Sequence, residues 1–105
     1  MEQKHLIIVD EQSQSATLDA IKNTLKNEGI DLVYKEINPA NFQKRVGYNT
    51  SFDKISFIEE LQNTPFLKKL DAFASDYNLI ENELNGLDVV KIFAKNVPSY
   101  HKKTD

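Results

Sequence analysis

The chain has 105 residues, of which 40% are hydrophobic and 28% are charged, values typical of one soluble globular domain. Its formal net charge of −3 provides no basic surface for nucleic acid or for an anionic membrane. The absence of cysteine excludes disulfides, thiolate zinc sites and a cysteine nucleophile. No apolar run approaches the ~18 residues of a membrane span or the pattern of a signal peptide, so we expect a cytoplasmic protein.

The first predicted element is a strand that ends in two acids. Residues 6–9 read Leu-Ile-Ile-Val, and a run this uniformly apolar is typical of a parallel strand that is covered on both faces. Asp10 and Glu11 follow it at once. We expect His5, which precedes the strand, to be solvated.

A helix and a second strand are predicted next. Ser13 or Ser15 can cap the helix, and Gly29 can end it. The apolar stripe of this helix would be Leu18, Ile21 and Leu25. The second strand covers residues 31–37, where the charged pair Lys35-Glu36 favours an edge position. Strand, helix and strand over about 30 residues form a right-handed parallel crossover unit.

We expect an extended connection with an extra helix over residues 38–69. Residues 39–50 show no clear period and predict a long loop with at most one helical turn. Thr50 or Ser51 can cap the helix that follows. The stripe of that helix would be Phe52, Ile55, Ile58 and Leu61. Thr64-Pro65 then predicts a short second helix.

A third strand, residues 72–75, ends in Asp76, and a polar, turn-rich loop follows it. Asn85-Gly86 opens a helical pattern that we expect to reach about Lys95. The tail, residues 97–105, is polar and has no strand pattern. The aromatic residues expected in the core are Phe52, Phe57, Phe66, Phe73 and Phe93.

Carboxylates at two strand ends form the candidate site. In a doubly wound parallel sheet with the strand order 2-1-3, strands one and three are neighbours, so Asp10, Glu11 and Asp76 would converge within a few ångströms. Carboxylates this close repel one another unless some are protonated or a cation lies among them. Their hard oxygen ligands suit Mg²⁺. Glu81 and Glu83 are expected to face water unless one of them approaches the ion.

Two segments together resemble the receiver domain of two-component response regulators. They are residues 6–11, the strand with its acids, and Asp76-Tyr-Asn-Leu ahead of Asn85-Gly-Leu-Asp. The order of elements matches over residues 5 to about 96. The resemblance implies an α/β fold of the flavodoxin-like type, in which a doubly wound parallel sheet lies between two layers of helices.

The same resemblance implies a Mg²⁺-dependent function in phosphorelay signal transduction. Asp76 would be the phosphoacceptor, and the metal would be held by Asp10, Glu11, Asp76 and the backbone carbonyl of Asn78. The phosphoryl group would come from a histidine kinase or another phosphodonor, such as a phosphotransfer protein. A fused or associated effector domain would give the output. No enzyme activity is implied beyond autocatalytic phosphotransfer and dephosphorylation.

The sequence also departs from the family pattern. Ile80 stands where the family usually has a proline, and the loop after Asp76 and the connection 38–69 are both longer than usual. The chain stops where a fourth strand would begin, so strands four and five are missing, with the Ser or Thr and the Lys that contact the phosphoryl group. Lys102-Lys103 lies in the tail instead. We therefore expect a single, incomplete receiver-like domain.

Two other functions stay open. A pseudo-receiver, an interaction module without phosphotransfer, is favoured by the missing Ser or Thr and Lys. A metal-dependent phosphoryl-transfer enzyme of another doubly wound family ranks last. Such an enzyme would need a second aspartate two residues after its nucleophile, where this chain has Gln12 after Asp10 and Asn78 after Asp76.

Overall fold

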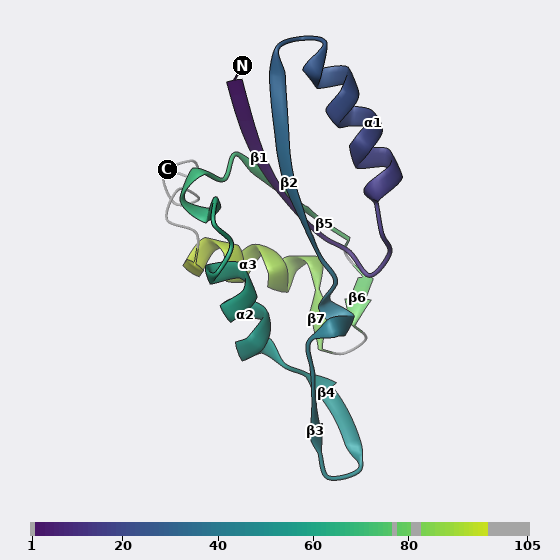
Figure 1. Ribbon diagram of the computed structural model, residues 1–105. Helices are drawn as coiled ribbons and strands as arrows, with labels where there is room; N and C mark the ends of the chain where they lie inside the picture. Colours follow the sequence, from purple (N-terminus) through teal and green to yellow (C-terminus); the bar gives the residue numbers. More distant parts are fainter. Residues whose placement is uncertain (1, 77, 81–82, 97–105) are drawn as a thin grey trace.

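The computed structural model is an α/β fold built around a three-stranded parallel sheet (Figure 1). The structure describes residues 2–76, 78–80 and 83–96. The sheet has the strand order β2-β1-β5. Its strands are β1 (Glu2–Val9), β2 (Ile30–Ile37) and β5 (Ala72–Ser75). The predicted order is therefore confirmed, with the first strand between the other two and all three running in one direction.

Strand β1 is longer than predicted, and this changes the position of His5. The strand begins four residues before the apolar run, and His5 pairs with Val33 of β2 in the register. Its side chain points to the same face as Ile7 and Val9, because alternate residues of a strand share a face. His5 is 8% exposed, so the expectation that it is solvated is wrong.

Helix α1 (Ser15–Lys26) covers one face of the sheet over β2. Leu18 of the helix and Leu32 of the strand are both buried, and the Tyr34 hydroxyl donates a hydrogen bond to Asp19 over 2.8 Å. The rest of the predicted stripe is less buried, since Ile21 is 44% exposed. On the same face, both alanines of β5 are exposed. Helix α1 therefore leaves the β5 side of this face uncovered.

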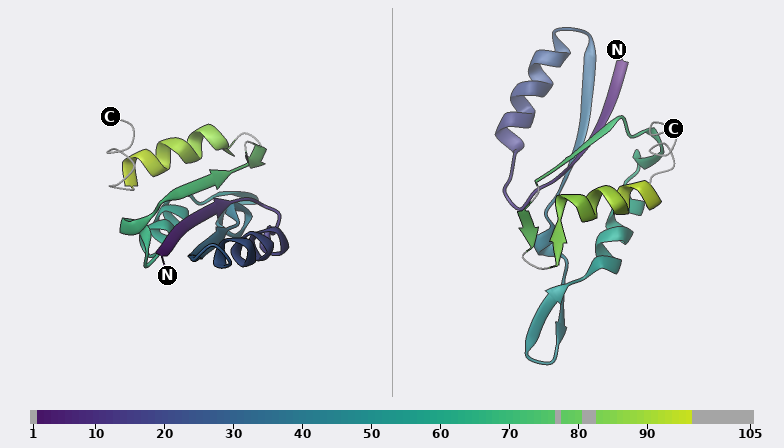
Figure 2. Two further views of the ribbon diagram at one scale, coloured as in Figure 1. Left: turned by 90° about the horizontal axis from the view of Figure 1, so that it is seen from above. Right: turned by 180° about the vertical axis from the view of Figure 1, so that it is seen from behind.

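Helices α2 (Lys54–Gln62) and α3 (Gly86–Asn96) pack on the opposite face, and Figure 2 shows α1 and α3 on opposite sides of the sheet. The sheet contributes Ile7, Val9 and Ile37 to one apolar cluster with both helices. The helices contribute Phe57, Leu61, Val89, Ile92 and Phe93. The ring of Phe73 stacks on that of Phe93, with centroids 4.1 Å apart. The five phenylalanines expected in the core all lie in this cluster or pack against it.

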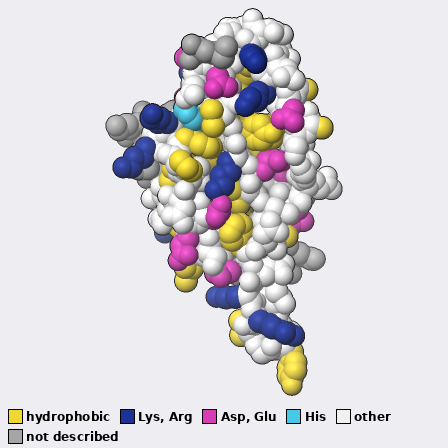
Figure 3. Space-filling view, viewed as in Figure 1, with side chains coloured by type: hydrophobic (Ala, Val, Ile, Leu, Met, Phe, Trp, Pro, Cys, Tyr) yellow, Lys and Arg dark blue, Asp and Glu magenta, His cyan; other side chains and the backbone are white. Residues whose placement is uncertain are grey.

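The connection between β2 and β5 contains a β-hairpin that was not predicted. Short helix η1 (Pro39–Asn41) is followed by β3 (Gln43–Val46) and β4 (Asn49–Phe52), which pair antiparallel. The expected loop at residues 39–50 is therefore wrong. Gly47 makes the tight turn with a φ of 65°, a conformation that costs glycine little. Figure 3 shows hydrophobic side chains at the tip of the hairpin and Lys or Arg side chains beside them.

Helix α2 starts later than predicted, because Phe52 completes the hairpin. Its N-cap is Asp53, which accepts hydrogen bonds from the backbone N–H and the hydroxyl of Ser56 over 3.2 and 2.7 Å. The two serine and threonine caps suggested by the sequence lie within β4 instead. The short helix expected after Pro65 is present as η2 (Leu67–Lys69).

Two short strands precede helix α3, where a polar loop was expected. They are β6 (Asn78–Ile80) and β7 (Leu84–Asn85), which pair antiparallel. The start of α3 agrees with the prediction, and its end differs by one residue. Asn85 and Asp88 form reciprocal caps, in which each side chain accepts the backbone N–H of the other over 2.9 and 3.0 Å.

Several sequence expectations fall outside the described residues. They concern Glu81 and the tail at residues 97–105, which includes Lys102-Lys103. Within the described part of the chain, no helix is long and apolar enough to cross a membrane.

Candidate functional site

The candidate site lies where β1 and β5 end side by side. Val9 and Ser75, the last residues of the two strands, are partners in the parallel register. The backbone N–H of Asp76 donates to the carbonyl of Val9 over 3.1 Å, and that of Asp10 donates to the carbonyl of Ile37 over 3.2 Å. The backbones of the two aspartates therefore leave neighbouring strands at the same edge, as the sequence predicted.

This edge is also where the direction of winding reverses. From β1 the chain passes through α1, on one face, to β2. From β2 it passes through α2, on the other face, and crosses beyond β1 to reach β5. In open α/β sheets such a switch point leaves a crevice at the carboxyl ends of the strands, where ligands bind. We call Asp10, Glu11 and Asp76 the acid edge.

The side chains of the acid edge do not gather into a metal site. Among the described residues, no three or more His, Asp or Glu side chains form a group that could hold a metal ion. Asp10 is held by its own loop, since its Oδ1 accepts the backbone N–H of Gln12 over 2.9 Å and its Oδ2 accepts the amide of Gln14 over 3.1 Å. Glu11 and Asp76 are exposed. The sequence thus located the edge but not the conformations of its carboxylates.

The residues of this edge have the ligand types that bind Mg²⁺, but their side chains are not arranged around a common ion position. Carboxylate and carbonyl oxygens are the ligands that this ion prefers. Asn78, whose carbonyl is the fourth candidate ligand, begins β6 and pairs with Asn85 of β7. Its backbone is therefore fixed two residues beyond Asp76. The carboxylate of Asp10 would have to bind the ion in addition to, or in place of, its two present donors.

Glu36 is a residue of this region that sequence reasoning missed. Its Oε1 accepts the backbone N–H of Gln14 over 2.6 Å, and its Oε2 accepts the hydroxyl of Ser15 over 3.2 Å. Glu36 thereby caps helix α1 from β2, since Gln14 makes no side-chain cap of its own. The available signal was its position one residue before the end of β2, on the face that α1 covers. Gln14 therefore links Glu36 to Asp10.

Asn38 connects the base of the β3–β4 hairpin to the acid edge by hydrogen bonds. Its side-chain amide donates to the backbone carbonyl of Glu11 over 3.2 Å, and its Oδ1 accepts the backbone N–H of Ala40 over 2.9 Å. Glu83 is exposed, as expected, and its Oε1 also accepts the backbone N–H of Phe52 over 3.0 Å. These contacts hold the segments that follow β2 and β6 close to the carboxyl end of the sheet.

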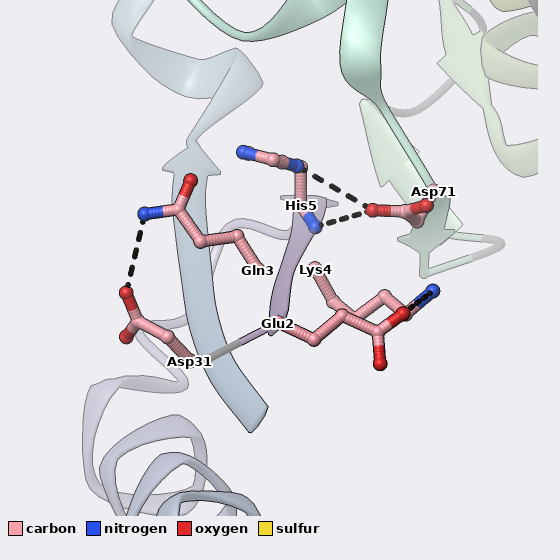
Figure 4. Close-up of polar contacts among 6 residues, drawn as sticks. All are labelled: Glu2, Gln3, Lys4, His5, Asp31 and Asp71. Atoms are coloured by element: carbon pink, nitrogen blue, oxygen red, sulfur yellow. Dashed lines mark hydrogen bonds and ion pairs between the residues drawn. The ribbon is translucent and has the colours of Figure 1, made fainter. Parts of the chain in front are cut away.

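A second polar cluster, in which His5 is buried and Asp71 is partly exposed, lies at the opposite end of β1 and β5 (Figure 4). Asp71 Oδ2 accepts the backbone N–H of His5 over 2.8 Å and lies 3.4 Å from its Nδ1. The hydrogen bond from the His5 backbone is the main cause that lowers the pKa of Asp71. The His5 ring also packs against Phe66, with centroids 5.3 Å apart. This cluster joins β5 to β1 and has no contact with the acid edge among the described residues.

A groove of about 660 Å³ lies between α2 and α3, away from the acid edge. Its apolar lining includes Phe52, Ile58, Leu84 and Ile92, and its charged lining includes Lys54, Lys91, Lys95, Glu83 and Asp88. Both acids already accept backbone hydrogen bonds, from Phe52 and Asn85. No sequence pattern indicates this groove, because its two walls are far apart in the chain.

Comparison with protein-family models, curated proteins and solved structures finds no match for this chain. Its class therefore follows from its own fold and from the position of its acidic residues. It is an α/β protein with a three-stranded parallel sheet, and acids from two neighbouring strands lie at the carboxyl end of that sheet.

Proposed function

We propose that this chain is a signalling domain of the receiver type, with a flavodoxin-like sheet, in which Asp76 accepts a phosphoryl group. The observation that carries the proposal is the pairing of Val9 with Ser75, which brings Asp10, Glu11 and Asp76 to one switch-point edge. A histidine kinase or a phosphotransfer protein would be the donor. A cytoplasmic location and an effector domain, fused or associated, are parts of the same proposal.

The chemistry requires an accessible carboxylate, and Asp76 is exposed. One of its oxygens attacks the phosphorus of the donor, and a carboxylate–phosphorus bond forms while the bond from phosphorus to the donor's leaving atom breaks. The leaving group departs with the electron pair of that bond. Asp10, Glu11, Asp76 and the Asn78 carbonyl would hold Mg²⁺, which would supply positive charge next to the transferred group.

Asp10 keeps capacity for this role in its present conformation. An ionised carboxylate offers about four acceptor sites, and its two donors, from Gln12 and Gln14, occupy two of them. These donors fix the carboxylate at the end of β1. Asp10 is therefore an oriented carboxylate at the end of β1, the neighbour of the strand that ends before Asp76.

A small-molecule phosphodonor tests the proposal. Incubation of the protein with acetyl phosphate and Mg²⁺ should add one phosphoryl group, measured by intact mass spectrometry. Asp76→Asn should abolish the addition, because an amide is not a competent nucleophile here. Asp31→Asn, at the other end of β2, is the matched control and should be labelled like the wild type. An unlabelled wild type, or labelling of the Asp76→Asn variant, would refute phosphotransfer.

A pseudo-receiver is the second candidate, and one observation favours it. The three carboxylates of the acid edge do not form a metal-holding group among the described residues. This candidate is the interpretation to adopt if the acetyl phosphate assay fails. It requires that Mg²⁺ bind no more tightly than millimolar, and that Asp76→Ala leave partner binding unchanged.

A further inference from the structure

The β3–β4 hairpin projects from the same end of the molecule as the acid edge. β2 ends at Ile37, the register partner of Val9, and β3 begins six residues later. Figures 1 and 2 show the hairpin extending from this end, beyond the sheet and the helices. We call residues 43–52 the arm.

The arm is exposed along nearly its whole length. Every residue from 43 to 50 is exposed, with Tyr48 at 102% and Val46 at 59%. Its base is anchored, where the rings of Phe42 and Phe52 each lie 5.7 Å from that of Phe57. A two-stranded hairpin is marginally stable on its own in water, and exposed aromatic tips are typical of contact surfaces. The arm therefore has the properties of a docking element.

The charge of the arm is opposite to that of the chain. Residues 38–52 contain Lys44 and Arg45 and no acid, whereas the whole chain carries a net charge of −3. Neither cation forms an ion pair with a carboxylate in the described part of the chain. The arm thus presents two cations beside an apolar tip, and an acidic surface with apolar residues next to it would complement it.

The acid edge is such a surface. Glu11 and Asp76 are exposed, and Ala74, two residues before Asp76, is exposed on the face of β5 that α1 leaves uncovered. Since the arm and the acid edge share one end of the molecule, a two-fold axis at that end can bring each arm to the acid edge of the other copy. We propose that two copies of this chain form such a reciprocal dimer. The proposal rests on surface charge and shape, and it holds whether or not Asp76 accepts a phosphoryl group.

Sedimentation equilibrium of the full chain is the test. The wild type should dimerise with a dissociation constant on the order of 100 µM, as expected of a small polar interface. An increase in NaCl from about 50 to about 500 mM should weaken the dimer roughly tenfold, because its ion pairs lie at the surface. A wild type that stays monomeric at about ten times that protein concentration would overturn the proposal.

Charge reversal identifies the two surfaces. Lys44→Glu with Arg45→Glu should give a monomer, and so should Glu11→Lys with Asp76→Lys. An equimolar mixture of these two double variants should restore a heterodimer. The control, Lys68→Glu with Lys69→Glu, lies at the other end of β5, makes the same change in net charge as the Lys44→Glu with Arg45→Glu variant, and should dimerise like the wild type. Failure of the mixture to associate, or equal dissociation of the control, would overturn the proposal. Circular dichroism of each variant verifies that it is folded.

Discussion

At the scale of single residues, Asp71 shows how one carboxylate can hold two strands together. It lies just before β5, and it both accepts the backbone N–H of His5 and donates its own N–H to the His5 carbonyl over 2.9 Å. The pKa of Asp71 is lowered from 3.8, first by that backbone hydrogen bond and further by the nearby Lys4 and His5. A carboxylate in this position stabilises the fold in its ionised form.

The pH dependence of stability should follow from this shift. Because the pKa of Asp71 is lower in the folded chain than in the unfolded chain, its stabilising effect is complete above the unfolded value near 3.8. It is lost as the pH falls through the folded-state pKa. Asp71→Asn should reduce the free energy of unfolding at neutral pH by about 0.5 kcal/mol, a small value because 38% of the side chain is exposed.

Urea denaturation at neutral pH and near pH 3 measures this effect. Between these two conditions, the Asp71→Asn variant should lose less stability than the wild type. Asp31→Asn, which removes a carboxylate that accepts a long hydrogen bond of 3.4 Å from Gln3, is the control. If Asp71→Asn and wild type lose stability equally on acidification, Asp71 does not contribute to acid sensitivity.

The position of His5 could have been predicted only with the correct start of β1. The polar residues from Glu2 to Lys4 carry no apolar alternation, so the sequence shows a strand only from Leu6 onward. Pairing with β2 extends the strand by backbone hydrogen bonds, which do not depend on the side chains. Once His5 lies inside the strand, alternation directs it to the face that holds Phe66.

At the scale of secondary-structure elements, helix α1 depends on an acid from another strand. Glu36 accepts hydrogen bonds from both Gln14 and Ser15 at the first turn of the helix, where the helix dipole also favours a negative charge. Glu36→Gln should lower the free energy of unfolding by about 1 kcal/mol. Chemical denaturation followed by circular dichroism measures this change. Glu28→Gln, an exposed site after the helix, should have no such effect; equal losses would contradict the capping role.

Elements with a strong apolar period were the ones that the sequence predicted. The continuous run in β1, the stripe in α3 and the strand before Asp76 all appear where expected. The hairpin was missed because β3 and β4 face water and show no alternation, and because Gly47-Tyr48 lacks the Asn-Gly or Asp-Gly pair that is the strongest sequence signal of a hairpin turn. The predicted caps of α2 were wrong for the same reason, because Thr50 and Ser51 belong to strand β4.

At the scale of the whole molecule, Phe57 is the point where the hairpin, helix α2 and the sheet meet. Its side chain is fully buried and contacts the rings of Phe42 and Phe52 at the base of the arm. Phe57→Ala should lower the free energy of unfolding by about 3–5 kcal/mol, because it leaves a cavity in the core. Ile55→Ala, on the same helix but 68% exposed, should change it by less than about 0.5 kcal/mol. Urea denaturation of both variants compares them, and similar losses would contradict this view of the core.

The sequence located the candidate site at this scale, but not its side-chain contacts. The order of the three strands follows from apolar patterning and crossover rules, and it places Asp10 and Asp76 at one edge. The contacts of Asp10 depend instead on the backbone N–H of Gln12 and the side-chain amide of Gln14, which donate to its two oxygens within one short loop. Such local contacts leave no periodic trace in a sequence.

The shared contact of Gln14 has a practical consequence for mutagenesis. This residue donates its side-chain amide to Asp10 and its backbone N–H to Glu36, so an exchange at Asp10 also releases a tether on the first turn of α1. A loss of function after replacing Asp10 would confound damage to the chemistry with a frayed helix. Substitutions at Glu11 and Asp76, whose carboxylates are exposed, are the cleaner probes of this end of the sheet.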